Sequence, residues 1–428
     1  MVKPGYKQTE IGVIPEDWKV LPLKALYNIT SSKRVFQSEW RNNGVPFYRA
    51  REIAVMSEGK PAPKDLFITQ EMYETYVKQY GEIHENDVLI TGVGTLGKVY
   101  VVKKSDKFYF KDGNIIWLQW KGLSDSVFIK YLYETPLLKK QVIDNAGRST
   151  VGTYTISNAQ DTITPYPPLP EQQRIAEALS DMDELIASFE KMIAKKKAIK
   201  QGAMQELLTG KRRLPGFSGE WKSKQFGELF LILPNNAYTH DQLSYGGKIK
   251  NIHYGDILTK YGACLDDSSS GIPTLEKSLE KKVFPEKAFV QNGDIIIADT
   301  AEDLTVGKAV EMLNVSGKVL SGQHTFFCRP RIPFAPMYLG YYLNSADFHG
   351  QIIPFVTGTK VSSINKTALC GLTVRYPDIS EQRAIAEVLS DLDNNISILE
   401  QRLRKACQSK QGMMQQLLTG KIRLEKKV

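Results

Sequence analysis

A stretch of 44 residues occurs twice in this chain, with the two copies 210 positions apart. Residues 171–214 align without a gap to residues 381–424, and 24 of the 44 positions are identical. About 170 residues separate the copies, whereas solenoid repeats recur roughly every 20–50 residues. The chain therefore contains one long unit that occurs twice in succession. This repeat predicts two similar halves that are related by a pseudo-two-fold axis.

Each copy has the pattern of a long helix with one narrow apolar seam. Apolar residues recur at alternating spacings of three and four, as in a coiled coil, and Gly210 and Gly420 mark the helix ends. A narrow seam suits a partner helix better than a broad core, and the partner of matching length is the other copy. We therefore predict that the chain folds back on itself and that the helices form an antiparallel coiled coil. The predicted pairing residues are Leu179, Met182, Ile186, Phe189 and Ile193 in the first helix and Leu389, Leu392, Ile396, Leu399 and Leu403 in the second.

Two segments of similar size accompany the helices, and they are weakly related to each other. Their short apolar runs, punctuated by Gly, Asn and Asp, indicate strands and turns, so each segment is predicted to be an α+β domain. The matched strings are Trp18-Lys19 with Trp221-Lys222, residues 86–90 with 293–297, and residues 97–99 with 307–309. The predicted boundaries are a first domain at 1–168, a helix region at 169–214, a second domain at 215–377 and a second helix region at 378–428.

Composition narrows the class of partner. Fifty-six Lys and Arg residues against 47 Asp and Glu residues leave a net charge of +9, which favours polyanionic partners. No apolar run approaches the length of a membrane span and no secretory signal follows Met1, so we expect a cytoplasmic protein. The four cysteines are far apart without a C-x-x-C pair, which argues against disulfides and a thiolate zinc site and predicts buried apolar cysteines.

One glycine-rich string imitates a nucleotide-binding motif. Residues 92–99, Gly-Val-Gly-Thr-Leu-Gly-Lys-Val, satisfy G-x-G-x-x-G and come within one residue of a P-loop. A P-loop needs Ser or Thr after the Lys, and this chain has Val99. Both motifs also need a helix next to hold phosphate, whereas residues 99–102 are predicted to form a strand. We therefore predict a tight strand connection.

Other catalytic patterns are missing from the sequence. A methyltransferase acting on an exocyclic amine would show D/N-P-P-Y/F/W, and residues 165–168, Pro-Tyr-Pro-Pro, have the wrong order. The five histidines form no i,i+4 pair or H-E-x-x-H, and no G-x-S-x-G elbow occurs. The pattern favours a binding protein that borrows its chemistry from partners.

Several strings together resemble a known family. The first domain closes with P-P-L-P-E-Q-Q-R-I-A and the second with E-Q-R-A-I-A, and both halves end in L-L-T-G-K-x-R-L. Residues 8–18 and 214–221 are typical of that family's entry into each domain. Over nearly its whole length, the chain resembles the DNA-specificity (S) subunit of a Type I restriction-modification system.

The resemblance implies a division of labour. Each α+β domain would be a target-recognition domain that reads one part of a split double-stranded DNA site, while the helices set the unread gap. The helices would also dock two modification subunits, which carry S-adenosylmethionine and methylate adenine. Restriction subunits, with motor and nuclease activity and with ATP and magnesium, could then join. The chain itself would bind no cofactor or metal and catalyse nothing.

Comparison of the two domains selects candidate DNA-reading residues. Residues 46–53 align with 250–257, which places Arg49 opposite His253. Residues 111–114 align with 320–323, which places Asn114 opposite Gln323. An Arg side chain can contact guanine, and an amide side chain can contact adenine. For each residue taken alone, an ordinary solvated turn remains the alternative. The candidate DNA-binding residues are Lys33, Arg34, Tyr48, Arg49, Arg51, Lys111, Asn114, Arg148 and Thr150 in the first domain and Asn236, Tyr238, His253, Tyr254, Gln323, His324, Thr359 and Lys360 in the second.

Two other functions remain open from the sequence. One is a fused DNA methyltransferase or nuclease, which would transfer methyl groups or cut DNA without partners. The other is a coiled-coil adaptor that binds only protein, which would have no DNA affinity with or without modification subunits.

Overall fold

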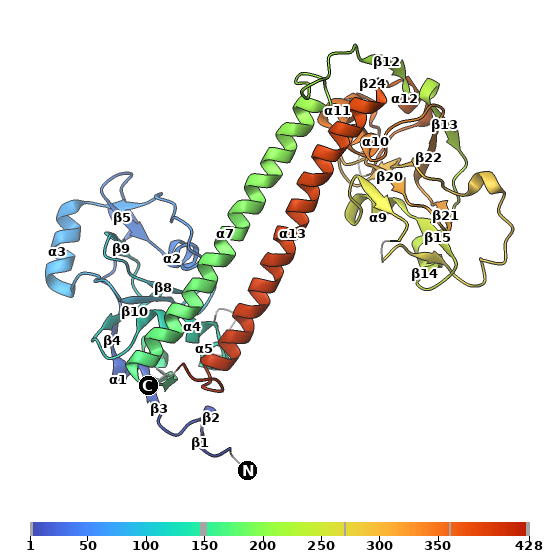
Figure 1. Cartoon of the computed structure of the whole chain (residues 1–428). Coiled ribbons are helices and arrows are strands. Elements are labelled where there is room, and N and C mark those ends of the chain that lie inside the picture. Colours follow the sequence, from blue (N-terminus) through green and yellow to red (C-terminus); the bar gives the residue numbers. More distant parts are fainter. Residues whose placement is uncertain (1–2, 146–151, 269–270, 359–360, 425–428) are drawn as a thin grey trace. The chain divides into compact units, whose positions relative to one another are not determined.

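The computed structural model describes residues 3–145, 152–268, 271–358 and 361–424. The chain divides into two compact units (Figure 1). Unit 1 comprises Met1–Phe189 and Arg402–Val428, and unit 2 comprises Glu190–Gln401. Each unit contains one α+β domain and a segment of each long helix. No helix in the described residues combines the length and apolar content needed to cross a bilayer.

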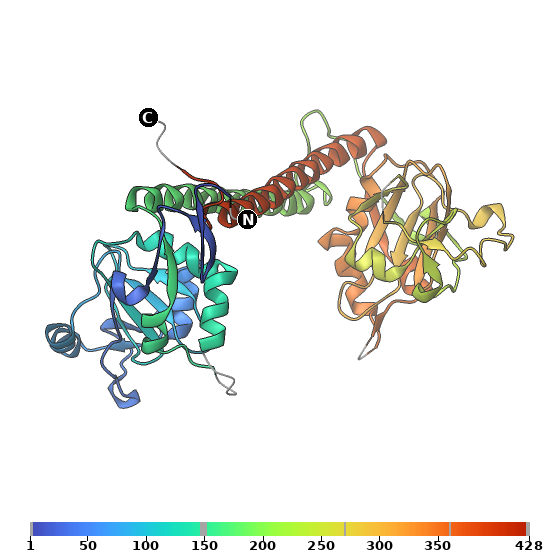
Figure 2. The ribbon, with the colours of Figure 1, turned by 90° about the horizontal axis from the view of Figure 1, so that it is seen from below.

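The two long helices have equal lengths. Helix α7 (Leu169–Leu207) and helix α13 (Ile379–Leu417) each contain 39 residues. Gly210 and Gly420 follow them with φ values of 72° and 69°. This left-handed conformation is typical of glycine just after a helix, where it ends the helical hydrogen bonding without a Cβ clash. Figures 1 and 2 show that, in each unit, the segment of α7 lies beside the segment of α13.

Ion pairs show that the helices run antiparallel within each unit. In unit 1, Lys410 pairs with Asp183, and Arg423, just after α13, pairs with Glu171. In unit 2, the pairs are Lys197 with Glu400 and Lys200 with Asp393. Higher numbers on α7 face lower numbers on α13 in both cases. The predicted antiparallel coiled coil is therefore confirmed.

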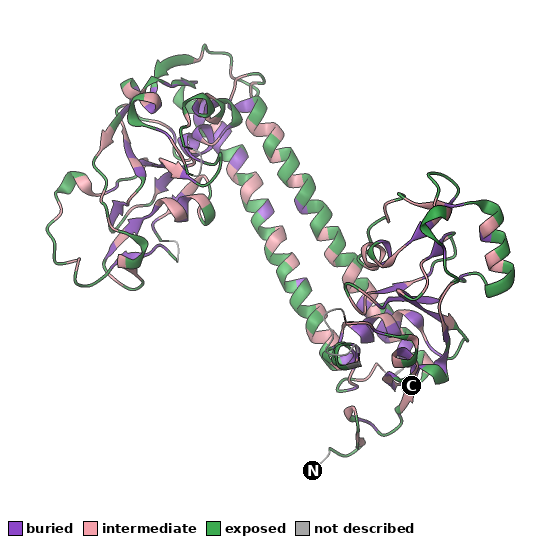
Figure 3. Cartoon of the chain, turned by 180° about the vertical axis from the view of Figure 1, so that it is seen from behind, coloured by how far each residue is buried: buried purple, intermediate pink, exposed green. Residues whose placement is uncertain are grey.

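The seam of the coiled coil is narrow. All ten predicted pairing residues are buried or half-buried, and Leu179 and Leu389 are fully buried. Much of the remaining helix surface is exposed (Figure 3). The exposed residues include the apolar Leu185, Met192 and Ile199. The apolar stripe that faces the partner helix is thus the part of each helix that is removed from water.

The first domain is built around an antiparallel four-stranded sheet in the order β4-β10-β7-β8, with a three-stranded sheet β6-β5-β9 in which β5 runs parallel to β9. Helices α4 and α5 pack on its core with the ends of α7 and α13. The elements are β1 Tyr6–Thr9, β2 Gly12–Pro15, β3 Lys19–Pro22, α1 Leu23–Leu26, β4 Tyr27–Thr30, η1 Gln37–Glu39, β5 Val45–Tyr48, α2 Ala50–Ser57, β6 Phe67–Ile68, α3 Gln70–Tyr80, β7 Val88–Thr91, β8 Val99–Val101, β9 Tyr109–Phe110, β10 Ile115–Trp120, α4 Ser126–Glu134, α5 Pro136–Asn145, α6 Ile156–Asp161 and β11 Ile163–Tyr166.

The second domain repeats this plan with additions. Its main sheet has the order β13-β22-β18-β20-β16, and its second sheet has the order β14-β17-β15-β21 with β15 parallel to β21. The elements are β12 Lys222–Gln225, α8 Phe226–Leu229, β13 Phe230–Leu233, η2 His240–Gln242, β14 Leu243–Ser244, β15 Ile249–Ile252, α9 Tyr254–Thr259, β16 Cys264–Asp266, β17 Thr274–Leu275, η3 Glu286–Ala288, β18 Ile295–Ala298, β19 Thr300–Ala301, β20 Ala309–Leu313, β21 Lys318–Ser321, β22 Thr325–Pro330, α10 Tyr338–Leu343, α11 Ala346–Ile352, η4 Ile353–Phe355, β23 Ser362–Ser363, α12 Lys366–Gly371 and β24 Thr373–Tyr376.

Strand registers show that the two domains are equivalent. Ile90 pairs with Ile116 and Val99 in the first domain, as Ile297 pairs with Phe326 and Ala309 in the second. The strings at 86–90 and 293–297 therefore occupy the same strand, as do those at 97–99 and 307–309. The predicted α+β fold with an internal two-fold repeat is confirmed.

The glycine-rich string forms a strand connection. Residues 92–98 connect β7 to β8, which pair antiparallel, and Gly97 donates its N–H to the Thr91 carbonyl at 2.9 Å. No helix follows to present amides to a phosphate. The predicted tight turn is therefore what the structure contains.

The cysteines correct one expectation. Cys328 is buried, but Cys407 is exposed on α13, and Cys264 and Cys370 are half-buried. All four are free thiols. The prediction that the cysteines are buried apolar residues is therefore wrong for Cys407, which lies outside the seam of the coiled coil.

Candidate nucleic-acid interface

In the first domain, most of the predicted DNA-reading residues come together where strands β5 and β9 end. Lys111 donates its backbone N–H to the Tyr48 carbonyl at 2.8 Å, which holds the loop after β9 beside the start of α2. The Ser31 hydroxyl accepts from the Gly113 N–H at 3.1 Å and so holds the loop after β4 against the same edge. The residues gathered there are Lys33, Arg34, Tyr48, Arg49, Arg51, Lys111 and Asn114.

Arg49 at this edge is engaged within the protein. It is the N-cap residue of α2, and its Nε and Nη2 contact the two carboxylate oxygens of Glu52 at 3.2 and 2.9 Å. Burial raises the pKa of Glu52, but the hydrogen bonds and charge of Arg49 outweigh it and hold that pKa below its usual range. A bidentate guanine contact needs two parallel N–H groups. Arg49 already uses two of its own, whereas Arg51 has a side chain that is 68% exposed.

The other cations of this edge lie on structured loops. The Lys33 ammonium is 5.5 Å from the centroid of the Tyr80 ring. Arg34 Nε is 3.0 Å from Asp112 Oδ2, and its side chain is 65% exposed. Exposed pairs of this kind contribute little stability. Lys33 and Arg34 thus place two positive charges at this edge.

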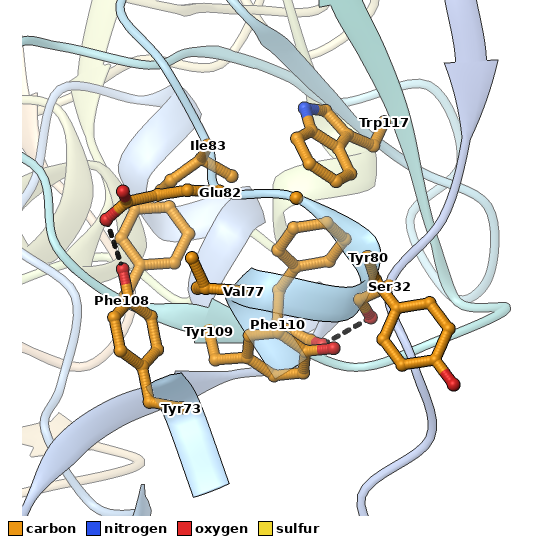
Figure 4. Close-up of a pocket in the computed structure, with 11 residues that line it drawn as sticks. Ser32, Tyr73, Val77, Tyr80, Glu82, Ile83, Phe108, Tyr109, Phe110 and Trp117 are labelled. Carbon is orange, nitrogen blue, oxygen red and sulfur yellow. Dashed lines mark hydrogen bonds between the residues drawn. The ribbon is translucent and has the colours of Figure 1, made fainter. Parts of the chain in front are cut away.

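An aromatic layer lies beneath the loop after β4 (Figure 4). The Ser32 hydroxyl donates to the Phe110 carbonyl at 2.6 Å, and the Tyr73 hydroxyl donates to Glu82 at 2.6 Å. The cavity lined by these residues has a volume of about 10 Å³, which is room for about one water molecule. The layer therefore supports the loop and does not form a ligand pocket.

In the second domain, the equivalent edge holds four ring side chains. The centroid of the His253 ring lies 5.7 Å from that of His240 and 4.6 Å from that of Tyr254. The Tyr254 centroid is 5.3 Å from that of His324. In the first domain, Arg49 stands at the position of His253 and Ala50 at the position of Tyr254, so neither position carries a ring. The same fold thus presents different chemistry at this edge in the two domains.

His253 is the N-cap residue of α9. Its Nδ1 accepts from the Gly255 N–H at 3.3 Å, which assigns the neutral tautomer with the proton on Nε2. Burial lowers the pKa of His253, and the neighbouring His240 and His324 lower it further against the opposing effect of Asp256. The ring is therefore held neutral, with one N–H donor.

The Asn236 side chain stabilises its own loop through hydrogen bonds. Its Nδ2 donates to Asn251 Oδ1 at 2.6 Å and to the Ser321 carbonyl at 2.8 Å. Its Oδ1 accepts from the Tyr238 N–H at 3.1 Å. Because its donors and acceptor are used, the amide holds this loop and is not available to contact a base. The Tyr238 ring lies beneath the Lys282 ammonium, 5.1 Å from it.

The structure corrects one alignment between the domains. Asn114 and Gln323 are not equivalent, because the turn from β9 to β10 has four residues and the turn from β21 to β22 has three. Gly92 donates to the Asn114 carbonyl at 2.8 Å, whereas its counterpart Asp299 donates to the His324 carbonyl at 3.1 Å. The structural counterpart of Asn114 is therefore His324. One residue added in a turn cannot be located from strings this dissimilar.

Some candidates cannot be placed, and one neighbour was not predicted. Arg148, Thr150, Thr359 and Lys360 lie outside the described residues. His240, which is exposed and contacts His253, was not among the predicted residues. His240 follows Tyr238 by two positions in the same loop. It would have been found if the set of candidate residues had included the next residues of that loop.

A large cavity in unit 2 is separate from the candidate DNA-binding residues that the structure describes. A cavity of about 610 Å³ in unit 2 is lined by Asp294, Glu311, Arg329 and Arg331, among other residues, and includes none of the predicted DNA-binding residues. Burial raises the pKa of Glu311 to about 7, although backbone N–H groups of residues 337–340 oppose that shift. Within the part of the chain that the structure describes, no cluster of three His, Cys, Asp or Glu residues is placed to hold a metal ion.

Comparison with known proteins agrees with this organisation. The family described as Type I restriction modification DNA specificity domain matches residues 15–201 and 218–406. The MjaVIII specificity subunit of a type I restriction enzyme, from Methanocaldococcus jannaschii, is 23% identical over 449 residues, covering 96% of this chain and 94% of that protein.

Solved structures share the fold. The S subunit of a type I restriction-modification system from M. genitalium matches with a TM-score of 0.57 and 13% identity, covering 94% of this chain and 96% of that one. A chain from a structural study of complex assembly and conformational transition in a type I system matches with a TM-score of 0.57 and 16% identity, covering 96% and 99%. At these identities, the likeness shows the fold alone.

Proposed function

The chain belongs to the family of type I restriction-modification specificity subunits, and from this premise we propose that it selects the DNA sequence on which such a complex acts. Each α+β domain reads one part of a split double-stranded site, and the stretch between the two parts is unread. The half-sites differ because the two reading edges carry different side chains.

One observation supports this proposal above the others. The equivalent edges, where β5 and β9 end in the first domain and β15 and β21 end in the second, have the same backbone hydrogen bonds: Lys111 to Tyr48 and Gly322 to Ile252, both at 2.8 Å. The side chains nevertheless differ, because Arg49 stands where His253 does and the exposed Arg51 stands where Gly255 does. A constant backbone with divergent polar side chains is what two readers of different bases require.

The chemistry is assigned to partner subunits. Two modification subunits would bring S-adenosylmethionine and methylate adenine within each half-site. Restriction subunits would bring ATP, magnesium and the nuclease. This chain supplies DNA contacts and docking surfaces and carries out no catalytic step.

Two experiments separate this function from its alternatives. The purified chain, incubated with radiolabelled S-adenosylmethionine and plasmid DNA, is expected to transfer no label, and addition of the modification subunits is expected to start transfer. Transfer by the chain alone would identify a fused methyltransferase.

The second experiment measures DNA binding by the complex with modification subunits at several salt concentrations. A specificity subunit predicts binding that weakens as salt rises and a preference for one sequence. A protein-only adaptor predicts a complex whose DNA affinity does not change when this chain is left out.

A further inference from the structure

A partly buried three-residue cluster links the first domain to the two long helices. Asp183 on α7 accepts from the Tyr131 hydroxyl of α4 at 2.8 Å, and it pairs with Lys410 on α13 at 2.8 Å. The Lys410 ammonium also lies 5.2 Å from the Tyr131 ring centroid, and its side chain is only 16% exposed. Glu134 adds a second carboxylate at 3.3 Å. The cluster therefore joins one domain helix to both long helices.

The second domain has the same cluster. Asp393 on α13 accepts from the Tyr341 hydroxyl of α10 at 2.8 Å and pairs with Lys200 on α7 at 2.6 Å. Lys200 lies 5.4 Å from the Tyr341 ring centroid, and its side chain is 22% exposed. Each residue of one cluster is 210 positions from its counterpart in the other. Two domains with different reading edges thus keep one attachment unchanged.

In the described part of unit 1, the cluster lies farther along α7 than the buried core that the first domain shares with that helix. In unit 1, the buried core of the domain includes α7 residues as far as Leu179, and Asp183 lies one turn beyond. A second polar attachment lies at the helix start, where Arg423 binds Glu171. Twelve residues of helix separate Glu171 from Asp183, which is about 18 Å. A body held at two points this far apart cannot tilt about either one.

The charges indicate that the cluster fixes geometry. Burial lowers the pKa of Lys410, but hydrogen bonds and charge from Asp183 and Glu134 outweigh it, so the pKa is raised and the ammonium is charged. A partly buried ion pair adds little stability compared with apolar side chains of similar size, whereas its hydrogen bonds are directional and favour one arrangement of the three residues.

We propose that the Tyr131–Asp183–Lys410 and Tyr341–Asp393–Lys200 clusters fix the tilt of each target-recognition domain on the helix pair, and so restrict the complex to one gap length between its half-sites. The inference rests on the proposed function. A shift of a reading edge by about 3.4 Å corresponds to one base pair. With the outer attachment removed, the first domain is held only through its core contacts up to Leu179 and through the Arg423–Glu171 pair, so it tilts more freely and reaches neighbouring gap lengths.

The test compares methylation of DNA substrates that share both half-sites and differ in gap length. The variants are Lys410→Met and Lys200→Met, which keep the length of the side chain and remove its charge, and the control is Lys405→Met at an exposed position of α13. The complete complex with modification subunits is used. We expect the ratio of methylation at gaps one base pair longer or shorter to methylation at the native gap to rise about tenfold, with half-site sequences unchanged. Lys410→Arg should restore the native ratio.

Tyr131→Phe provides a milder variant should a Lys variant fail to fold, because it removes one hydroxyl. An unchanged ratio in a folded variant, or a rise equal to that of Lys405→Met, would overturn the inference. Equal loss of methylation at all gaps would also overturn it, since it would assign the cluster to stability alone. If the wild-type complex methylates no split site at all, the proposed function fails, which is a separate result.

Discussion

Arg423 binds Glu171 through two N–H groups, with Nε–Oε1 at 2.7 Å and Nη2–Oε2 at 2.8 Å. Glu171 is 2% exposed and also accepts from the Trp18 indole N–H at 3.1 Å. Arg213 and Glu381 form the corresponding pair in unit 2. The segment after α13 therefore contacts the start of α7, beside the first domain. The segment after α7 contacts the start of α13 in the same way.

Loss of this pair is expected to destabilise unit 1. Arg423→Ala leaves a buried carboxylate without its cation, and breaking such a pair costs about 3 kcal/mol. Arg212→Ala removes an exposed pair with Glu206 and is the matched control, with an expected cost of about 0–1 kcal/mol. The measurement is chemical denaturation followed by circular dichroism. Equal stability of the two variants would contradict the importance of the Arg423–Glu171 pair.

Arg51 is expected to contribute to reading in the first domain. Arg51→Ala should weaken binding by about 1–3 kcal/mol and relax the preference at one half-site only. Arg49→Ala should in addition lower the stability of the domain, because it leaves the buried Glu52 carboxylate without its hydrogen-bond partner. Competition binding against substrates altered in one half-site measures both effects. A uniform loss on all sequences would identify Arg51 as a phosphate contact.

His253 makes the stability of unit 2 depend on pH. Its pKa in the folded state lies below 6.5, so as pH falls through 6.5 the unfolded chain takes up a proton that the folded chain does not. The free energy of unfolding therefore falls on the acid side of pH 6.5. The loss is about 1.4 kcal/mol for each pH unit by which the His253 pKa in the folded state lies below that in the unfolded state. His253→Asn keeps an N-cap acceptor and should flatten the curve between pH 8 and pH 5.

The control for this prediction is His84→Asn, an exposed histidine in unit 1. Denaturation curves at several pH values compare the three proteins. A His253→Asn protein that loses as much stability as the wild type on acidification would show that another group is responsible.

The length of the helices is expected to set the gap. Insertion of four residues between Lys195 and Lys196, matched by four between Ile398 and Leu399, adds about 6 Å to each helix and nearly preserves the seam. We expect the preferred gap to lengthen by about two base pairs, since each base pair rises about 3.4 Å. Methylation of a series of gap lengths measures it. A lengthened variant that still prefers the original gap would contradict the proposal.

The long helices were predictable because their pattern is local. Seam residues such as Leu179 and Leu389 recur at coiled-coil spacing, and the repeat supplied the partner for each helix. The strands at 88–90 and 295–297 were also visible, because short apolar runs flanked by turn residues carry their own signal.

The site was less predictable because it depends on contacts between distant residues. The side-chain pairing of Arg49 with Glu52 is not visible in the sequence. The extra residue between Phe110 and Ile115 displaces Asn114 by one position relative to the second domain, which the aligned strings do not show. The Tyr131 and Tyr341 attachments keep the 210-residue offset but lie outside the 44-residue repeat. Only the fold shows that each tyrosine meets an aspartate and a lysine.

The proposed function requires one chain to read two separate half-sites through two dissimilar domains. The decisive measurement is a map of adenine methylation in DNA exposed to the complex with its modification subunits. We expect one motif of two different half-sites separated by an unread gap of fixed length, and Arg51→Ala should alter only one of the halves. A single uninterrupted motif, or a change in both halves from that one substitution, would contradict it.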